Sequence, residues 1–153
     1  MRKKALFIIL AALLIGCLSA CGKEEKSDDG THGVGEAVQV NDVIITLDSA
    51  SLVSYKVKVE FTVENKGSAD LTLDPETSFV IEGDNTGTKV DLTLDPVGCS
   101  NSLSGTVPAG GSLTGELCWR SDPSLTWPTV AFISYGGDSM ASAAAVWKVA
   151  LEE

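Results

Sequence analysis

The sequence predicts an antiparallel β-sandwich, and two observations lead to that fold class. Short segments in which apolar and polar residues alternate follow one another through residues 35–153. No segment there shows a convincing long amphipathic helix with its period of about 3.6 residues. About eight short strands separated by turns, without such a helix, are typical of two packed sheets.

The clearest strand is predicted at residues 55–64. Its odd-numbered residues, from Tyr55 to Val63, are apolar, and its even-numbered residues are charged or Thr. We expect the first set to face a core and the second to face water. The same pattern predicts seven further strands. They are residues 36–40, 43–52, 71–73, 79–82, 89–94, 112–119 and 129–135.

Turn residues separate these strands. The segment GDNTG at residues 83–87 predicts a hairpin turn, and PAGG at residues 108–111 predicts another reversal. The C-terminal residues 141–151 leave two alternatives. Their alanine content favours a helix, whereas the alternation from Ala145 to Leu151 favours a last strand, which we expect because sheet partners override weak propensity.

The N-terminus has the three parts of a secretory signal. Residues 1–4 are basic apart from Met1, residues 5–15 are apolar, and small residues then precede a cysteine. The apolar run is shorter than the ~20 residues of a membrane-spanning helix. A signal peptide is therefore preferred over a retained span.

The tetrapeptide LSAC at residues 18–21 resembles the lipobox of bacterial lipoproteins. The resemblance implies a diacylglycerol on the sulfur of Cys21, removal of residues 1–20 and an anchor on the extracytoplasmic side of the cell membrane. Cys17 ends a similar tetrapeptide. Cleavage before Cys21 exposes a polar segment at once and leaves an even number of cysteines behind it. Cleavage before Cys17 would instead leave Cys21 as an odd thiol in an oxidising compartment.

Residues 21–34 are predicted to be the lipidated cysteine and a flexible tether ahead of the domain at residues 35–153. The tether carries charge, Ser and Gly without an apolar period, and it contains the only histidine, His32. Removing residues 1–20 removes three cations, so the formal charge changes from −10 to −13. Such acidity argues against nucleic acid as a partner. It also argues against attraction to anionic lipid, so attachment depends on the acyl chains.

Three segments carry a second resemblance. GEAV at residues 35–38 leads into VII at 43–45, the strand at 57–63 runs into ENKG at 64–67, and PAGGSLTGEL occupies 108–117. Together they resemble a family of immunoglobulin-like domains of unknown function on Gram-positive lipoproteins. The resemblance implies an immunoglobulin-like sandwich on a Gram-positive cell surface. Its motifs are turns and strands without a chemical signature, so they imply fold rather than activity.

Cys99 and Cys118 are expected to form a disulfide. In the strand at residues 112–119 the apolar residues share one face, so Cys118 lies on the opposite, outer face. A bond to Cys99 would staple the loop at residues 98–111 over that face. A metal or redox role would need CxxC spacing or a nearby histidine, and the sequence has neither.

Two ligand sites are weaker candidates. Trp119 and Trp147 are expected in the core, but Trp127 lies in a connection, where it either contacts a glycan or partner or covers the end of the core. The hexapeptide DLTLDP occurs twice, at residues 70–75 and 91–96, and Asp-Pro should end each short strand. Its carboxylates suit calcium if the strands are neighbours, although no complete calcium loop is present, so we assign no metal. The calcium candidates are Asp70, Asp74, Asp84, Asp91 and Asp95.

No catalytic constellation is evident, so we expect no enzyme activity and no cofactor. Serine and cysteine nucleophiles need a histidine in the folded body, and nothing singles out a carboxylate pair. We expect a module that binds an envelope or surface protein through loops or an open sheet edge. The alternatives are a glycan- or calcium-binding module and a structural spacer lipoprotein.

Overall fold

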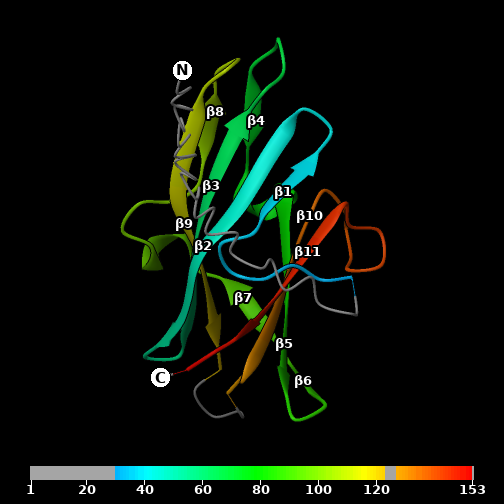
Figure 1. Ribbon diagram of the computed structural model, residues 1–153. Helices are drawn as coiled ribbons and strands as arrows, with labels where there is room; N and C mark the ends of the chain where they lie inside the picture. Colours follow the sequence, from blue (N-terminus) through cyan, green and yellow to red (C-terminus); the bar gives the residue numbers. More distant parts are fainter. Residues whose placement is uncertain (1–29, 123–126, 153) are drawn as a thin grey trace, which may run out of the picture.

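The computed structural model describes residues 30–122 and 127–152, and most of this part forms β-strands (Figure 1). Within these residues, eleven strands, one short α-helix and one 3-10 turn follow one another. They are β1 (Ala37–Val40), β2 (Val43–Val53), β3 (Lys56–Asn65), β4 (Leu71–Leu73), α1 (Pro75–Ser78), β5 (Phe79–Asn85), β6 (Thr88–Val90), β7 (Leu92–Leu94), η1 (Pro96–Gly98), β8 (Gly105–Val107), β9 (Ser112–Ser121), β10 (Val130–Tyr135) and β11 (Ala145–Ala150).

The strands form two main antiparallel sheets. One has five strands in the order β1-β2-β3-β9-β7, and the other has four in the order β11-β10-β5-β6. A two-stranded pair, β4-β8, lies at one end of the molecule (Figure 1). The predicted β-sandwich is confirmed. The predicted last strand is confirmed as well, since β11 pairs with β10 along its whole length.

The core lies where the two sheets face each other. The odd-numbered residues of β3 from Val57 to Val63 are fully buried, as their alternation predicts. The ring of Phe61 lies 5.3 Å from that of Phe79 and meets Trp147 edge-on at 5.2 Å. These contacts join β3 of one sheet to β5 and β11 of the other. Trp119 and Trp147 are both buried, as expected.

The predicted strand at residues 89–94 is wrong as a single strand. It is two strands interrupted at Asp91, with β6 in the four-stranded sheet and β7 in the five-stranded sheet. The chain crosses between the sheets there, which periodicity along one segment cannot reveal. Sequence reasoning also missed β8, whose three residues are too few to show a period.

Tyr55 does not face the core as predicted. β2 ends at Val53 and β3 begins at Lys56, so Ser54 and Tyr55 form the turn between them. Both have left-handed backbone, with φ of 48° and 69°. A two-residue hairpin of this kind needs positive φ at both positions, which moves Tyr55 out of the strand.

The boundary between tether and domain also needs correction. His32 lies beside β11: its N–H donates to the Val146 carbonyl at 2.8 Å, and its carbonyl accepts from the Lys148 N–H at 3.0 Å. Its ring is 2.6 Å from a carboxylate oxygen of Glu36. The last residues of the predicted tether thus belong to the folded domain. The predicted signal peptide at residues 1–20 and the lipidation site Cys21 lie outside the described residues.

Candidate functional site

The turn between β2 and β3 lies at the lower left of Figure 1, and it carries exposed apolar side chains. Val53 is 57% exposed, Tyr55 is 40% exposed and Val97 of η1 is 94% exposed. Val97 precedes Gly98, which lines the same pocket as Val53. We call Val53, Tyr55, Val97 and Trp127, whose ring stacks on Tyr55, the apolar tip.

Trp127 and Tyr55 form an aromatic pair. Their ring centroids are 4.1 Å apart and their planes differ by 28°. Asn85 of β5 donates a hydrogen bond to the Trp127 carbonyl, and the Trp127 side chain packs partly against the core. Tyr55 therefore covers one face of the ring that the sequence offered as a ligand contact. The pair as a unit, with Tyr55 outermost, is what a ligand would meet.

The turn that carries Tyr55 is unfavourable for its residues. Left-handed backbone suits Gly and Asn, which usually occupy such two-residue hairpins, whereas here Ser54 and Tyr55 adopt it. Sparsely populated backbone costs on the order of 1–3 kcal/mol at each non-glycine residue and gathers at functional sites. The position of the Tyr55 ring is thus held at a cost in stability.

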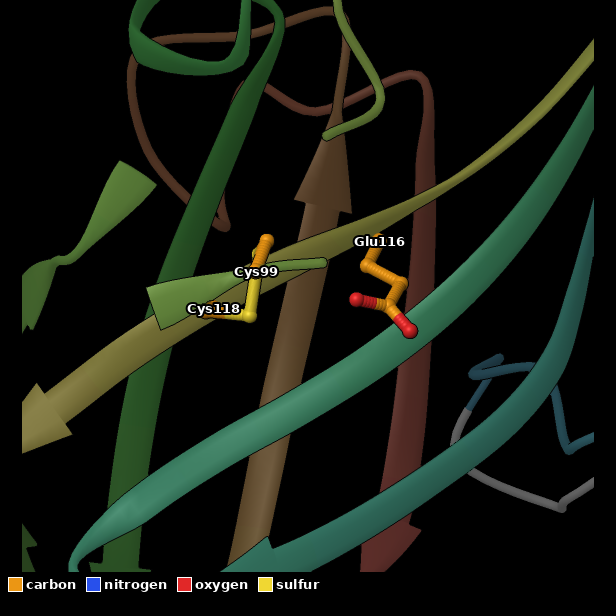
Figure 2. A group of neighbouring side chains, drawn as sticks. All are labelled: Cys99, Glu116 and Cys118. Atoms are coloured by element: carbon orange, nitrogen blue, oxygen red, sulfur yellow. A yellow bond between two sulfur atoms is a disulfide. The ribbon is translucent and has the colours of Figure 1, made fainter. Parts of the chain in front are cut away.

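A pocket of about 300 Å³ lies next to the tip, beside the disulfide. It is lined by Val53, Ser54, Lys56, Lys58, Gly98 and Cys118. Figure 2 shows the bond between Cys99 and Cys118, whose Cα atoms are 5.7 Å apart, with Glu116 beside it on β9. The predicted pairing is present in the structure, and Cys118 is only 1% exposed.

The sequence predicts that the loop held by the disulfide crosses the outer face of β9. In the structure this loop runs along the edge of β9 instead. Glu116 donates its N–H to the Asn101 carbonyl at 2.6 Å and accepts from the Leu103 N–H at 2.9 Å. Gly115 permits this approach, because a Cβ atom there would lie 2.7 Å from the Leu103 Cα. The buried side chain of Leu103 thereby enters the core.

Three of the six Lys and Arg residues in the described part lie at this end: Lys56, Lys58 and Arg120. Arg120 Nη2 and Lys56 Nζ lie 2.8 Å and 3.5 Å from the same Asp95 oxygen. The hydrogen bond from Arg120 lowers the pKa of Asp95. Half of the cations in the described part therefore lie at this end of a chain whose formal charge is −10.

Lys58 pairs with Glu116 on the neighbouring strand, Nζ to Oε1, at 2.5 Å. The backbone N–H of Ser100 donates to the other oxygen of Glu116 at 2.8 Å. The hydrogen bond from Lys58 is the main cause of a lowered pKa at Glu116, and the Ser100 N–H acts in the same direction. Glu116 therefore links β3, β9 and the loop that follows Cys99.

Glu116→Gln should destabilise the protein at pH 7 and have little effect in acid. The pKa of Glu116 is lowered in the folded state from its ordinary value of 4.5. The charged carboxylate therefore stabilises the fold at pH values above 4.5, and this stabilisation is lost as the pH falls through the folded-state pKa. For this solvent-screened pair we expect less than about 1 kcal/mol. Urea unfolding of both proteins between pH 7 and pH 3 measures it. A difference that stays constant with pH would contradict the role of the charge.

The calcium candidates do not come together. Asp70 accepts from the Ala109 N–H, Asp74 caps α1, Asp84 accepts from the Gly87 N–H in its hairpin, and Asp95 pairs with cations. The two DLTLDP segments lie in different sheets, with β4 in the two-stranded pair and β7 in the five-stranded sheet. In residues 30–122 and 127–152, no three of these carboxylates lie close enough to share an ion. The condition for the calcium interpretation is therefore not met.

One other group in the described part has metal-ligand chemistry. The sulfurs of Cys99 and Cys118 and a carboxylate oxygen of Glu116 lie within 4.8 Å of one another (Figure 2). The sulfurs are bonded to each other, whereas metals bind thiolates. Glu116 already accepts from Lys58 and Ser100. This group therefore stabilises the fold and is not assigned as a metal site.

Comparison with solved structures identifies relatives in fold. The YjhA protein of Bacillus subtilis superposes with a TM-score of 0.54 at 18% identity, over 80% of this chain and all of that one. YcdA of the same species, a candidate lipoprotein, superposes with a TM-score of 0.52 at 19% identity. The match covers 74% of this chain and 38% of YcdA. An uncharacterised β-sandwich protein of Clostridium difficile superposes with a TM-score of 0.45 at 12% identity. The match covers 75% of this chain and 89% of that protein.

These similarities show the fold alone. No protein-family model matches the chain, and no curated protein matches its sequence. Within the described residues, no helix has the length and apolarity to cross a bilayer.

Sequence reasoning missed part of the apolar tip. Val97 stands between Pro96 and Gly98, where a turn was foreseeable but its exposure was not. Val53 continues an apolar strand pattern and gives no sign that it faces water. The pairing of Trp127 with Tyr55 joins segments more than seventy residues apart, and nothing local in the sequence signals it.

Proposed function

We propose that this protein is a lipid-anchored, immunoglobulin-like binding module of the extracytoplasmic cell envelope that contacts another protein through its apolar tip. One observation carries the proposal. Of the four large apolar side chains that are exposed in the described part, three (Val53, Tyr55 and Val97) belong to the tip. Clustered apolar exposure next to a polar rim is typical of protein interaction sites.

The charges around the tip indicate the chemistry of the partner. Lys56 and Arg120 flank the apolar residues, and Tyr, Trp and Arg are the residue types that contribute most to binding at interfaces. We therefore expect the partner to present apolar side chains with acidic residues around them. The membrane anchor at Cys21 and the Gram-positive cell surface complete the proposal. The anchor rests on the lipobox resemblance, and the Gram-positive surface rests on the resemblance to immunoglobulin-like lipoprotein domains.

Photo-cross-linking in the native membrane tests this function. A photoreactive residue at position 97 should capture one dominant protein, because Val97 is the most exposed apolar residue of the tip. The matched control is the same residue at position 34, where Val34 is 55% exposed but lies outside the tip. Tyr55→Ala should weaken capture at position 97 about tenfold or more, as the loss of an interface anchor does.

Two outcomes would contradict the proposal. Equal capture at positions 34 and 97 would show non-specific contact, and no captured protein at position 97 would favour a spacer role. Mass spectrometry of the N-terminal peptide from the same sample should find the lipid on Cys21. Lipid on Cys17 instead would overturn the assigned anchor.

Glycan binding is the second candidate, because the Tyr55–Trp127 pair presents an exposed aromatic ring. Retention on cell-wall glycan that is lost in both Tyr55→Ala and Trp127→Ala, without a protein cross-link, would favour it. Retention that neither substitution changes would exclude the pair as a sugar platform.

A further inference from the structure

A groove of about 430 Å³ opens between the two sheets, and it shares no lining residue with the pocket beside the disulfide. β5 and β7 form its walls, and seven of its nine lining residues are apolar. Among the described residues that line it, Glu76 is the one with a charge. The lining residues are Pro75 and Glu76 of α1, Phe79, Val80 and Ile81 of β5, Leu92, Thr93 and Leu94 of β7, and Trp119 of β9.

The groove exists because the chain leaves one sheet for the other at Asp91. β6 pairs with residues 83–85 of β5 and then ends at Val90. The next three residues, β7, pair with β9 in the opposite sheet. Among the described residues, no strand therefore continues β6 alongside residues 79–82 of β5.

The backbone of β5 is oriented to accept a strand there. The carbonyls of Val80 and Asp84 point toward β10, since they accept from Ser134 Oγ and the Thr129 N–H. Backbone groups alternate in direction along an antiparallel strand, so those of Phe79 and Ile81 point to the other edge. In the part of the chain that the structure describes, no strand pairs with β5 at that edge between residues 79 and 82.

We propose that an extended segment of another protein adds to β5 at residues 79–82, in line with β6, and places alternate side chains in the groove. Backbone hydrogen bonds to Phe79 and Ile81 would set the register of the added segment. Contacts of its apolar side chains with Leu92, Leu94 and Trp119 would set its sequence preference. This binding site is separate from the apolar tip and goes beyond the function proposed above.

Two features define the occupant. The accessible edge spans four residues between α1 and the end of β6, which favours a narrow extended segment over the sheet of a second folded copy. Glu76 at the groove favours a cation beside the apolar residues of that segment. The occupant is therefore a peptide segment with alternating apolar residues and a flanking Lys or Arg.

Amide hydrogen exchange on the full-length protein in detergent micelles tests the proposal directly. The probe is the blocked heptapeptide acetyl-KVTVTVK-amide, which has alternating valines and lysine at each end. It should slow exchange of the Phe79 and Ile81 N–H groups and leave that of Gly83 unchanged, because Gly83 already pairs with β6. Tyr55→Ala should leave this protection unchanged, because the tip is a different site.

Two N-methylated probes supply the matched control. Methyl groups on alternate amides block one edge of the peptide, and methyl groups on the other set block the opposite edge. One analogue should bind about tenfold more weakly, from lost hydrogen bonds, and the other should bind as the parent does. Glu76→Gln should weaken the parent peptide about threefold, as a surface charge pair does.

Three results would overturn the inference. They are no protection of Phe79 and Ile81 at millimolar peptide, equal weakening by both methylated analogues, and protection confined to another sheet edge. Concentration-dependent protection of the same amides without peptide, with dimers in sedimentation, would assign the edge to a second copy instead. That result too would overturn the proposed occupant.

Discussion

Phe61→Ala should lower the free energy of unfolding by about 3–5 kcal/mol, the range for a large aromatic residue removed from a core. Phe61 is fully buried and lies between two other rings, Phe79 and Trp147. These rings belong to the opposite sheet, so the substitution leaves a cavity at the contact between the two layers. Urea unfolding monitored by circular dichroism measures the effect.

Phe132→Ala is the matched control for Phe61→Ala. Phe132 lies on β10 on the face opposite Ile133, which is buried, and its ring is 5.7 Å from the Lys148 ammonium. Its loss removes the same ring without opening the core and should cost about 1 kcal/mol or less. Equal losses for the two substitutions would contradict the placement of Phe61 between the sheets.

Breaking the Cys99–Cys118 disulfide should cost about 3 kcal/mol, since cross-linking residues 19 apart restricts the unfolded chain by that order. The double substitution Cys99→Ala with Cys118→Ala removes the bond without leaving a thiol in the buried position of Cys118. The midpoint of urea unfolding should fall in the double variant. It should fall similarly in the native protein when a phosphine reductant is added.

The reductant also supplies the control. It should leave the double variant unchanged, because that protein has no bond to reduce within residues 30–122 and 127–152. If the reductant lowered the stability of both proteins equally, its effect would have another cause. If it changed neither, the two cysteines would not be bonded in the protein as isolated.

Alternation along single strands made most of the fold predictable. The pattern at residues 55–64 gave β3 within one residue at either end, with the buried face assigned correctly from Val57 onward. The break at Asp91 escaped prediction because Lys89 to Leu94 keeps its alternation while the chain changes sheets. Local patterns report which side of a strand is buried, and they do not report which sheet the strand joins.

The candidate site was predictable only in its parts. Trp127 stood out because a large aromatic residue in a connection is conspicuous, and the Cys99–Cys118 pair followed from the count of cysteines. The tip depends instead on the left-handed turn at Ser54 and Tyr55, where neither residue is a usual turn former. The groove beside β5 depends on where a neighbouring strand stops, which is a property of the assembled sheets.

The contact between His32 and β11 has a consequence for how the protein stays soluble. β11 is the last strand of its sheet, and an uncovered last strand offers its backbone to other chains and promotes aggregation. The Val146 carbonyl and the Lys148 N–H are bonded to His32, so the segment that precedes β1 covers this edge. A proteolytic cut after residue 34 would allow this segment to leave, and the edge of β11 would then become a template for self-association.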